Sequence, residues 1–262
     1  MYDFNGILIA TDLDGTFVNS RGALVKRNLD AIEHFKAGGG LFTFATGRVI
    51  WSMSSLVSTY RDIVNAPMVL CNGATLYDPH TGKDIYADLL DENDTLEALE
   101  LIRDRFPVTK RFVYVGDDYT QVQDTDGSEL EQQRMYGWHK VLVECPTDLI
   151  GELDDTVRAA LPGRFAYSRS APFLFELLPP GSTKGRMLKR MKEYYKEQGK
   201  DVTVYAVGDF DNDLDMLRSA DVPCCPSNAL DSVKALCKIH LGHCDGGAIA
   251  DLIEQIAGVK AR

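Results

Sequence analysis

The chain has 262 residues, of which 45% are hydrophobic and 26% charged, and its formal net charge is −11. This composition is ordinary for a globular protein and supplies enough apolar residues for a sizeable core. The acidic balance argues against a nucleic-acid-binding protein, because affinity for a phosphate backbone depends on clustered Lys and Arg.

Strand-like apolar runs alternate with helical patterns in the first third of the chain. We predict strands over GILIAT (6–11), LFTFAT (41–46) and PMVLCN (67–72). The apolar spacing predicts helices over LVKRNLDAIEHFKAGG (24–39) and from about Val49. Such alternation is typical of parallel strands joined by crossover helices.

The last third resumes the same alternation. It predicts a helix from Ser182 to Gly199, a strand over VTVYAVGD (202–209), a helix over DNDLDMLRSA (211–220), a strand over DVPCC (221–225) and a closing helix over GGAIADLIEQI (246–256). We therefore expect one sheet built from both ends of the chain.

The middle of the chain has a different pattern. Hairpin-like pairs occur in RFVYVGDDYTQVQ (111–123) and FAYSRSAPFLFELL (165–178), with helical stretches near 93–106 and 147–160. Turn residues at 78–82 and 179–181 flank this part. The predicted fold class is α/β: a Rossmann-like three-layer parallel-sheet core at 1–78 and 179–262, with an α+β insert at 79–178.

Polar residues follow three of the predicted parallel strands. They are Asp12-Leu13-Asp14-Gly15-Thr16, Thr46-Gly47-Arg48 and Gly208-Asp209-Phe210-Asp211-Asn212-Asp213, while Ser182-Thr183-Lys184-Gly185 opens the helix after the insert. Ligands of open parallel sheets bind beyond the carboxyl ends of the strands. Each segment alone has a structural explanation as a turn or a helix cap, but that explanation is weak for all four in this order.

Together the four segments resemble the haloacid dehalogenase-like superfamily of phosphotransferases, and the insert is similar to the cap of its Cof-type phosphatase branch. The resemblance extends to Asn72-Gly73-Ala74, Phe175-Glu176, Asn228-Ala229 and Asp245-Gly246. Pro226-Ser227 departs from the pattern, because related chains usually have Gly before the Asn at 228. The resemblance implies a Mg²⁺-dependent phosphatase for a small phosphorylated metabolite, most often a sugar phosphate.

The resemblance also implies residue roles. Asp12 would be the nucleophile that forms an aspartyl-phosphate, and Asp14 the general acid and then base. Asp12, the Asp14 carbonyl and Asp209 would bind Mg²⁺, with Asp213 behind them. The phosphate group would be held by Thr46, Gly47, Lys184 and Asn212. Because these carboxylates and a phosphate dianion outweigh the positive charge of Lys184 and Mg²⁺, we expect metal-free protein to be inactive.

Two other functions stay open at this point. A phosphomutase or other phosphotransferase would use the same aspartyl-phosphate, and a non-catalytic protein could keep the fold merely to bind phosphorylated metabolites. Arg48 has two possible roles as well, a contact with substrate phosphate or an ion pair with a carboxylate, and the second is favoured.

The insert holds the candidates for substrate selection. The polar candidates are Arg111, Arg134, His139 and Arg169, and the further ones are Tyr114, Tyr167, Phe173 and Glu176.

A zinc site is not indicated, because the spacing of Cys237, His240, His243 and Cys244 does not match one. No run of apolar residues approaches the roughly 18 needed to span a bilayer. Scattered cysteines and an N-terminus without a signal-peptide pattern predict a cytoplasmic protein with reduced thiols, whose oligomeric state the sequence does not indicate.

Overall fold

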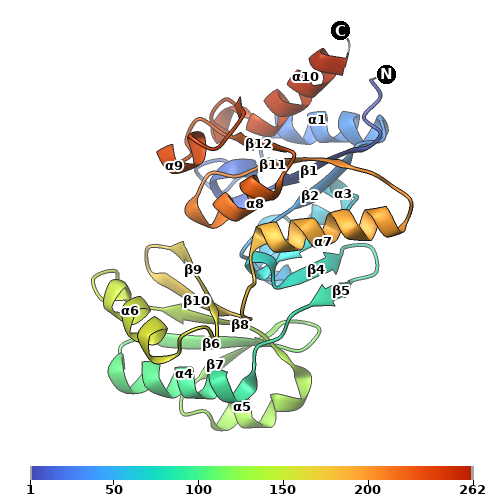
Figure 1. Cartoon of the computed structure of the whole chain (residues 1–262). Coiled ribbons are helices and arrows are strands. Elements are labelled where there is room, and N and C mark those ends of the chain that lie inside the picture. The colour runs from blue at the N-terminus through green and yellow to red at the C-terminus, as the bar shows by residue number, and fades with distance from the viewer. Residues whose placement is uncertain (1, 261–262) are drawn as a thin grey trace. The chain divides into compact units, whose positions relative to one another are not determined.

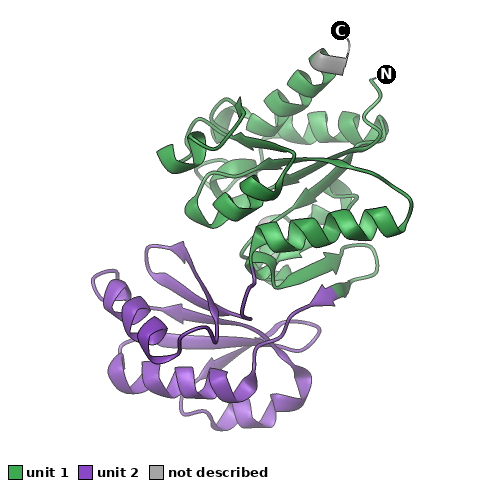
Figure 2. Cartoon of the chain, in the orientation of Figure 1, with its two compact units in different colours: residues 1–85, 183–262 green, residues 86–182 purple. Residues whose placement is uncertain are grey.

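The structure is a computed structural model that describes residues 2–260. The chain forms two compact units (Figure 2): unit 1 comprises residues 1–85 and 183–262, and unit 2 comprises residues 86–182. Within the described residues, no helix is both long and apolar enough to cross a membrane.

A five-stranded parallel sheet forms the centre of unit 1, in the order β13-β12-β11-β1-β2. The strands are β1 (Ile7–Thr11), β2 (Leu41–Phe44), β11 (Thr203–Val207), β12 (Val222–Cys225) and β13 (Ile239–His240). Every residue of β1 is buried, as expected for a parallel strand with both faces covered. β1 pairs with β2 on one side and β11 on the other, so both ends of the chain build one sheet.

Helices cover both faces of this sheet (Figure 1). α1 (Lys26–Ala37) packs on α10 (Ala248–Lys260), and α7 (Lys184–Glu197) packs on α8 (Leu214–Ser219) on the opposite face. Shorter helices are α2 (Ile50–Leu56), α3 (Tyr60–Ile63) and α9 (Asp231–Lys234). The predicted α/β class, with a parallel sheet between helices, is confirmed.

A small antiparallel sheet extends unit 1 beyond β2. It contains β3 (Met68–Leu70), β4 (Thr75–Asp78) and β5 (Lys83–Ala87), and an Ala45–Val69 bridge joins it to the parallel sheet. Because β5 is the third strand of this sheet, unit 1 continues to Ile85, whereas the sequence pattern put the boundary at 78/79. The chain returns to unit 1 at Thr183.

Unit 2 is a five-stranded antiparallel sheet with the order β7-β6-β8-β10-β9. Its strands are β6 (Lys110–Val115), β7 (Thr120–Asp124), β8 (Trp138–Glu144), β9 (Ala166–Ala171) and β10 (Leu174–Leu178). Its helices are α4 (Glu92–Arg105), α5 (Ser128–Gln132) and α6 (Ile150–Ala160). Both hairpins and both long helices were predicted from the sequence, but the central strand β8 was not.

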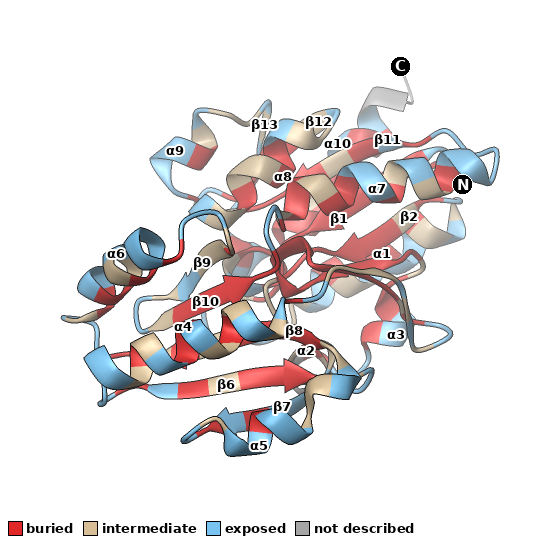
Figure 3. Cartoon of the chain, turned by 60° about the horizontal axis from the view of Figure 1, so that its bottom comes forward, coloured by how far each residue is buried: buried red, intermediate tan, exposed pale blue. Residues whose placement is uncertain are grey.

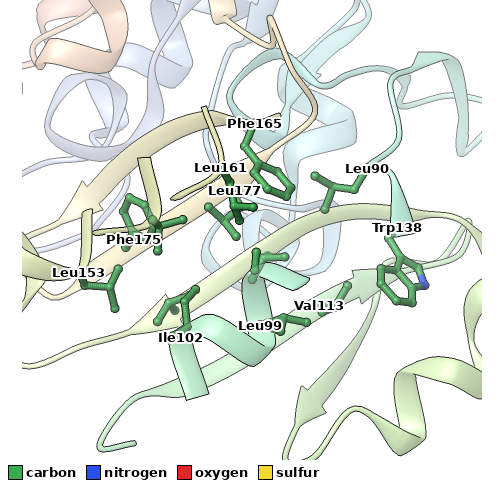
Figure 4. Packing of buried hydrophobic residues seen from close by; sticks show 14 of the residues in the cluster. Leu90, Leu99, Ile102, Val113, Trp138, Leu153, Leu161, Phe165, Phe175 and Leu177 are labelled. Carbon is green, nitrogen blue, oxygen red and sulfur yellow. The ribbon is translucent and has the colours of Figure 1, made fainter. Parts of the chain in front are cut away.

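The core of unit 2 lies between its sheet and α4 and α6. Figure 4 shows Leu99 and Ile102 of α4 with Val113 of β6 and Phe175 of β10 in this cluster, and Trp138 of β8 is fully buried there. The alternation of buried and exposed residues is visible in Figure 3, where the helices have buried inner faces and exposed outer faces. Unit 2 therefore has a hydrophobic core of its own.

Candidate active site

The polar segments singled out in the sequence follow three neighbouring strands of unit 1. The Asp12 N–H donates to the carbonyl of Val207, the last residue of β11, at 2.8 Å. Next to it, the Ala45 N–H donates to the Thr11 carbonyl at 2.8 Å, so the chain beyond β2 runs beside the end of β1. The segments that carry Asp12, Thr46 and Asp209 thus meet at the carboxyl edge of the sheet, where open α/β sheets bind ligands.

Among the residues that the structure describes, Lys184 is the one lysine or arginine within hydrogen-bonding distance of Asp12. Its Nζ donates to Asp12 Oδ1 at 2.5 Å and to Asp213 Oδ1 at 2.7 Å, and the side chain is fully buried. As the first residue of α7, Lys184 is fixed by its neighbour Thr183, whose side chain caps the helix by accepting the Arg186 N–H at 3.0 Å. The lysine ammonium is therefore held between two buried carboxylates.

Asp213 fixes the position of the Asp209 segment. Its Oδ2 accepts the backbone N–H groups of Asp209, at 2.9 Å, and Phe210, at 3.2 Å, while its Oδ1 accepts from Lys184. Gly208 has no room for a side chain, since a Cβ there would lie 2.5 Å from the Asp213 side chain. Both oxygens of Asp213 are thus occupied, which makes it an orienting residue.

Burial and neighbouring carboxylates shift the pKa values of Asp12 and Asp209. Burial, followed by repulsion from Asp213 and Asp209, raises the pKa of Asp12 to about 8 against the attraction of Lys184. Burial also raises the pKa of Asp209 to about 6, although the Thr16 hydroxyl, which donates to Asp209 Oδ1 at 2.6 Å, opposes this. For Lys184, burial works to lower the pKa, but the attraction of Asp12 and Asp213 outweighs it and raises the pKa above its usual value.

The acidic group has the donor atoms of a divalent-cation site. One carboxylate oxygen from each of Asp12, Asp209 and Asp213 lies within 4.8 Å of the others. Asp12 and Asp209 each use Oδ1 in the hydrogen bonds above, which leaves Oδ2 of both for a ligand. A Cβ at Gly15 would lie 2.6 Å from Asp209 Oδ2, so the backbone next to Asp14 runs against that oxygen. Hard divalent cations prefer such oxygen ligands, and the residues fit one.

Thr46, Gly47 and Asn212 are connected through Asn72. The Asn212 amide donates to Asn72 Oδ1 at 3.2 Å, and a Cβ at Gly47 would lie 2.8 Å from the Asn72 amide. The Asn72 N–H in turn donates to the Thr46 carbonyl at 3.0 Å. Asn72 has no role predicted from the sequence, although Asn before Gly is a pattern that tolerates the left-handed conformation.

The backbone around Asn72 is unusual. Cys71, Asn72 and Gly73 have φ values of 50°, 51° and 96°, and the first two are uncommon for non-glycine residues. A Cβ at Gly73 would lie 2.0 Å from the Thr183 carbonyl, so only glycine lets this turn contact the start of α7. The turn places Asn72 beside the Thr46 segment and α7 at the same time.

Asp14 lies outside the Lys184 cluster and pairs with Arg48. The Arg48 Nε donates to Asp14 Oδ2 at 2.8 Å and Nη2 donates to Oδ1 at 2.9 Å, and the Asp14 side chain is 54% exposed. This hydrogen bond raises the pKa of Arg48 above its usual value despite partial burial. Of the two roles considered for Arg48, the geometry gives the ion pair.

A second loop braces the turn that follows Asp12. The Asn228 amide donates to the Gly15 carbonyl at 2.7 Å, and Asn228 Oδ1 accepts the Cys244 N–H at 3.0 Å. Asp245, next to Cys244 in the segment after β13, accepts the N–H and hydroxyl of Ser20. The structure therefore gives Asn228, which the sequence analysis noted only as part of a resemblance, a bridging position despite the Pro226-Ser227 departure.

Ligand atoms of His243, Cys244 and Asp245 form a second group within 4.8 Å of one another. His243 Nδ1 accepts the Asp245 N–H at 3.2 Å, and the Asp245 carboxylate is used by Ser20. These contacts cap and brace a tight turn, and the cysteine and histidine at 237 and 240 are not part of the group. The zinc interpretation that the spacing disfavoured gains no support.

The four polar candidates of the insert have partners inside unit 2. Arg111 is buried and donates to Asp124, Arg134 pairs with Glu131, and Arg169 pairs with Asp154. His139 is buried and stacks on Tyr119 at 4.2 Å between ring centroids, and burial lowers its pKa. A contact of any of them with substrate stays a prediction.

The model of the haloacid dehalogenase-like hydrolase family matches residues 9–253. The chain is 25% identical to the Bacillus subtilis 5-amino-6-(5-phospho-D-ribitylamino)uracil phosphatase YwtE, over 95% of this chain and 97% of that protein. It is 24% identical to the Escherichia coli pyridoxal phosphate phosphatase YbhA, over 94% and 97% of the two chains.

Solved structures show the same fold. A HAD/COF-like hydrolase from Plasmodium vivax has a TM-score of 0.81 at 19% identity, with 97% of both chains covered. A Thermotoga maritima protein has a TM-score of 0.77 at 21% identity, also with 97% of both chains covered. The chain therefore belongs to the haloacid dehalogenase-like hydrolases, in their Cof-type branch, and is a phosphoric monoester hydrolase.

Proposed function

We propose that the protein is a Mg²⁺-dependent phosphatase that hydrolyses a small phosphorylated metabolite of the sugar-phosphate type through a phosphorylated Asp12. The observation that carries the proposal is the buried contact of Lys184 Nζ with Asp12 Oδ1, beside Asp209 and Asp213 at the carboxyl edge of the sheet. A carboxylate that is buried, paired with a fixed cation and left with one unoccupied oxygen has the arrangement of a nucleophile.

Charge is the main obstacle to attack. Two unit charges about 4 Å apart, at an effective dielectric constant near 20, repel by roughly 4 kcal/mol, so a carboxylate needs cations beside it to approach a phosphate. Lys184 supplies one of them. A Mg²⁺ ion held by Asp12, Asp209 and the Asp14 carbonyl would supply two further positive charges and polarise the phosphoryl group as a Lewis acid.

Hydrolysis would take two steps, and residues of this protein act in each of them. In the first step, the Asp12 carboxylate forms a bond to phosphorus while the bond to the alcohol oxygen breaks, and Asp14 gives that oxygen a proton. In the second step, water attacks the phosphorus, Asp14 takes its proton, and Asp12 is released with inorganic phosphate. Thr46, Gly47 and Asn212 would orient the phosphoryl oxygens through hydroxyl, amide and backbone N–H donors.

The substrate is a small molecule on the evidence of the relatives. Their names specify a ribitylaminouracil phosphate, pyridoxal phosphate and glucosyl- or mannosyl-3-phosphoglycerate. We propose that residues 1–78 and 179–262 catalyse phosphoryl transfer and that residues 79–178 select the alcohol portion. The proposed location is the cytoplasm, where such metabolites are found.

The test is a phosphate-release screen across sugar phosphates, vitamin phosphates and nucleotides, with Mg²⁺ and with EDTA. We expect release from a subset of the small monoesters only when Mg²⁺ is present, and a mass increase of one phosphoryl group on the Asp12 peptide in acid-quenched protein. Conversion of a hexose 1-phosphate to its isomer without free phosphate would instead identify a mutase. Absence of turnover with every compound would leave a binding protein.

A further inference from the structure

Arg48 holds the Asp14 carboxylate with two nearly equal hydrogen bonds, at 2.8 Å and 2.9 Å. Fork-shaped pairing of this kind fixes the carboxylate in both position and orientation, which a single hydrogen bond or a lysine does not do. Asp14 Oδ1 and Oδ2 both accept hydrogen bonds in this arrangement.

The guanidinium is itself anchored. Its third nitrogen, Nη1, donates to Ser52 Oγ at 3.2 Å, so each of its terminal nitrogens has a partner. The Arg48 backbone is fixed as well, since its N–H donates to Thr46 Oγ1 at 3.2 Å and its carbonyl accepts the Cys71 N–H at 3.1 Å. Arg48 is therefore attached to the loop that carries the proposed phosphate-binding Thr46.

Stability does not account for this construction. The Asp14 side chain is 54% exposed and that of Arg48 33%, and ion pairs at such sites contribute about 0–1 kcal/mol to stability. The partner, however, is the residue to which the proposed mechanism assigns both proton transfers. The role of the Arg48–Asp14 pair is therefore to be found in how it positions that carboxyl group.

We infer that Arg48 is the positioning residue of Asp14: it keeps one hydrogen bond to the carboxyl group while the other oxygen carries the proton to the leaving alcohol. As the phosphorus–oxygen bond breaks, the proton moves to the alcohol oxygen and the freed carboxylate oxygen returns to the second guanidinium N–H. In the hydrolytic step the same oxygen leaves that N–H to accept a proton from water. This inference rests on the proposed function, since it needs Asp14 to act as acid and base.

The inference can be tested with aryl phosphates whose leaving groups differ in their need for a proton. p-Nitrophenyl phosphate releases a stable phenolate, whereas phenyl and p-methoxyphenyl phosphate release poorer leaving groups of similar size. The measurement is kcat/KM for the series at saturating Mg²⁺ and constant pH, with wild type, R48M, R48K and D14N.

We expect R48M to lose roughly 10- to 100-fold on phenyl phosphate but less than about threefold on p-nitrophenyl phosphate, because general acid catalysis contributes about 10²–10⁴-fold where protonation is needed. R48K should fall between wild type and R48M, since an ammonium cannot hold both oxygens in a fork. The double variant D14N/R48M should be no slower on phenyl phosphate than D14N, because the two residues act as a unit.

A matched control is R27M. Arg27 also pairs with carboxylates in unit 1, but on the α1–α10 pair: its Nη2 donates to both oxygens of Glu254, at 2.8 Å and 2.9 Å, and its Nη1 donates to Asp251. R27M should leave the dependence of kcat/KM on the leaving group unchanged. Thermal unfolding of all variants distinguishes a loss of folded protein from a misplaced Asp14 carboxyl group.

An equal loss by R48M across the series would overturn the inference, because a contact with phosphate or a structural role affects every substrate alike. If R48M behaves so while D12N is inactive and D14N is selectively slow on poor leaving groups, the inference fails and the proposed function stands. If D12N still turns over p-nitrophenyl phosphate, the proposed function itself fails.

Discussion

Both units bury charged side chains, but they balance them differently. In unit 2, Lys140 Nζ donates to Glu176 Oε1 at 2.6 Å and Arg111 Nε donates to Asp124 Oδ2 at 2.9 Å, so each buried carboxylate has its own cation. In the described part of unit 1, Lys184 is the one cationic side chain paired with Asp12 and Asp213, and Asp209 lies beside them.

The difference shows that buried charge alone does not identify a site. In a matched pair the two charges compensate each other, and removing one partner destabilises the fold, whereas the unit 1 group has more negative than positive charge. Burial and mutual repulsion there raise the pKa of Asp12 to about 8 and burial raises that of Asp209 to about 6. The imbalance distinguishes this acidic group, the proposed catalytic site, from the structural pairs.

Asp12→Asn should give the largest effect on activity. The amide keeps the shape but is not a nucleophile, so we expect phosphate release to fall by roughly 10⁴-fold or more. Folding should not suffer, because the substitution removes a carboxylate from a crowded site. The comparison predicts the opposite for Asp124→Asn in unit 2, which should lower the unfolding midpoint and leave kcat/KM unchanged; a stable D124N or an active D12N would contradict it.

Lys140→Met tests the matched pair of unit 2. Removal of one partner leaves the Glu176 carboxylate buried without its cation, which should cost about 3–5 kcal/mol of unfolding free energy in urea. The double variant Lys140→Met/Glu176→Leu removes both charges and should recover most of that loss. A single variant as stable as wild type would show that the pair is not structural.

Lys184→Met should weaken catalysis by about 2–4 kcal/mol of transition-state stabilisation, which is the usual cost of removing one preorganised charged donor. The readout is kcat/KM for the best substrate of the screen. Lys192→Met is the control, because Lys192 makes only a half-exposed pair with Asp221 at 2.8 Å. A loss below tenfold for Lys184→Met would mean that its ammonium does not act on the phosphoryl group.

Without Mg²⁺, the excess negative charge of the site should make the free energy of unfolding depend on pH. The folded-state pKa values of about 8 and about 6 lie above the ordinary 3.8, so the metal-free site favours folding fully below about pH 4 and loses that contribution as pH rises through 6 to 8. Mg²⁺ at 100 times its Kd should restore about 2.7 kcal/mol. The effect of Mg²⁺ on the unfolding midpoint should be large at pH 8.5 and small at pH 5, where protons compete with the metal. An equal effect at both pH values would refute the assignment of Asp12 and Asp209 as metal ligands.

Asn228→Ala should produce the smallest effect. It removes the amide between the Gly15 carbonyl and the Cys244 N–H, which should cost about 1–2 kcal/mol and raise the Mg²⁺ concentration for half-maximal activity several-fold. Asn65→Ala is a matched control, because Asn65 bridges the Phe42 N–H and the Gly40 carbonyl in the same way. It should cost similar stability without changing the Mg²⁺ requirement.

The sequence predicted the parallel sheet and the edge at which the acids gather. The spacing of apolar residues and the alternation of strands with helices are local signals in the sequence. Because parallel strands all end at the same edge of the sheet, these signals predict that strand ends such as Thr11 and Val207 are neighbours. For this reason the sequence alone predicts that the segments of Asp12, Thr46 and Asp209 lie close together.

Pairing over long sequence distances could not be predicted. β8 was missed because Lys140 interrupts its apolar pattern, and the partner that permits its burial, Glu176, lies 36 residues further on. Arg111 is one candidate for a substrate contact, and its pairing with Asp124 on the neighbouring strand has no signal in the sequence. The Arg48–Asp14 pair and the left-handed turn at Cys71 and Asn72 likewise depend on tertiary contacts that no local pattern contains.

The return of the chain from unit 2 has a consequence for engineering. Unit 1 resumes at Thr183, one residue before the buried lysine, and the Gly73 turn lies directly against the Thr183 carbonyl. Length is therefore fixed at this junction, since one added residue would displace the ammonium from its two carboxylates. A chimaera that takes its middle segment from a relative should vary the outgoing junction near Ile85 and keep the incoming one unchanged.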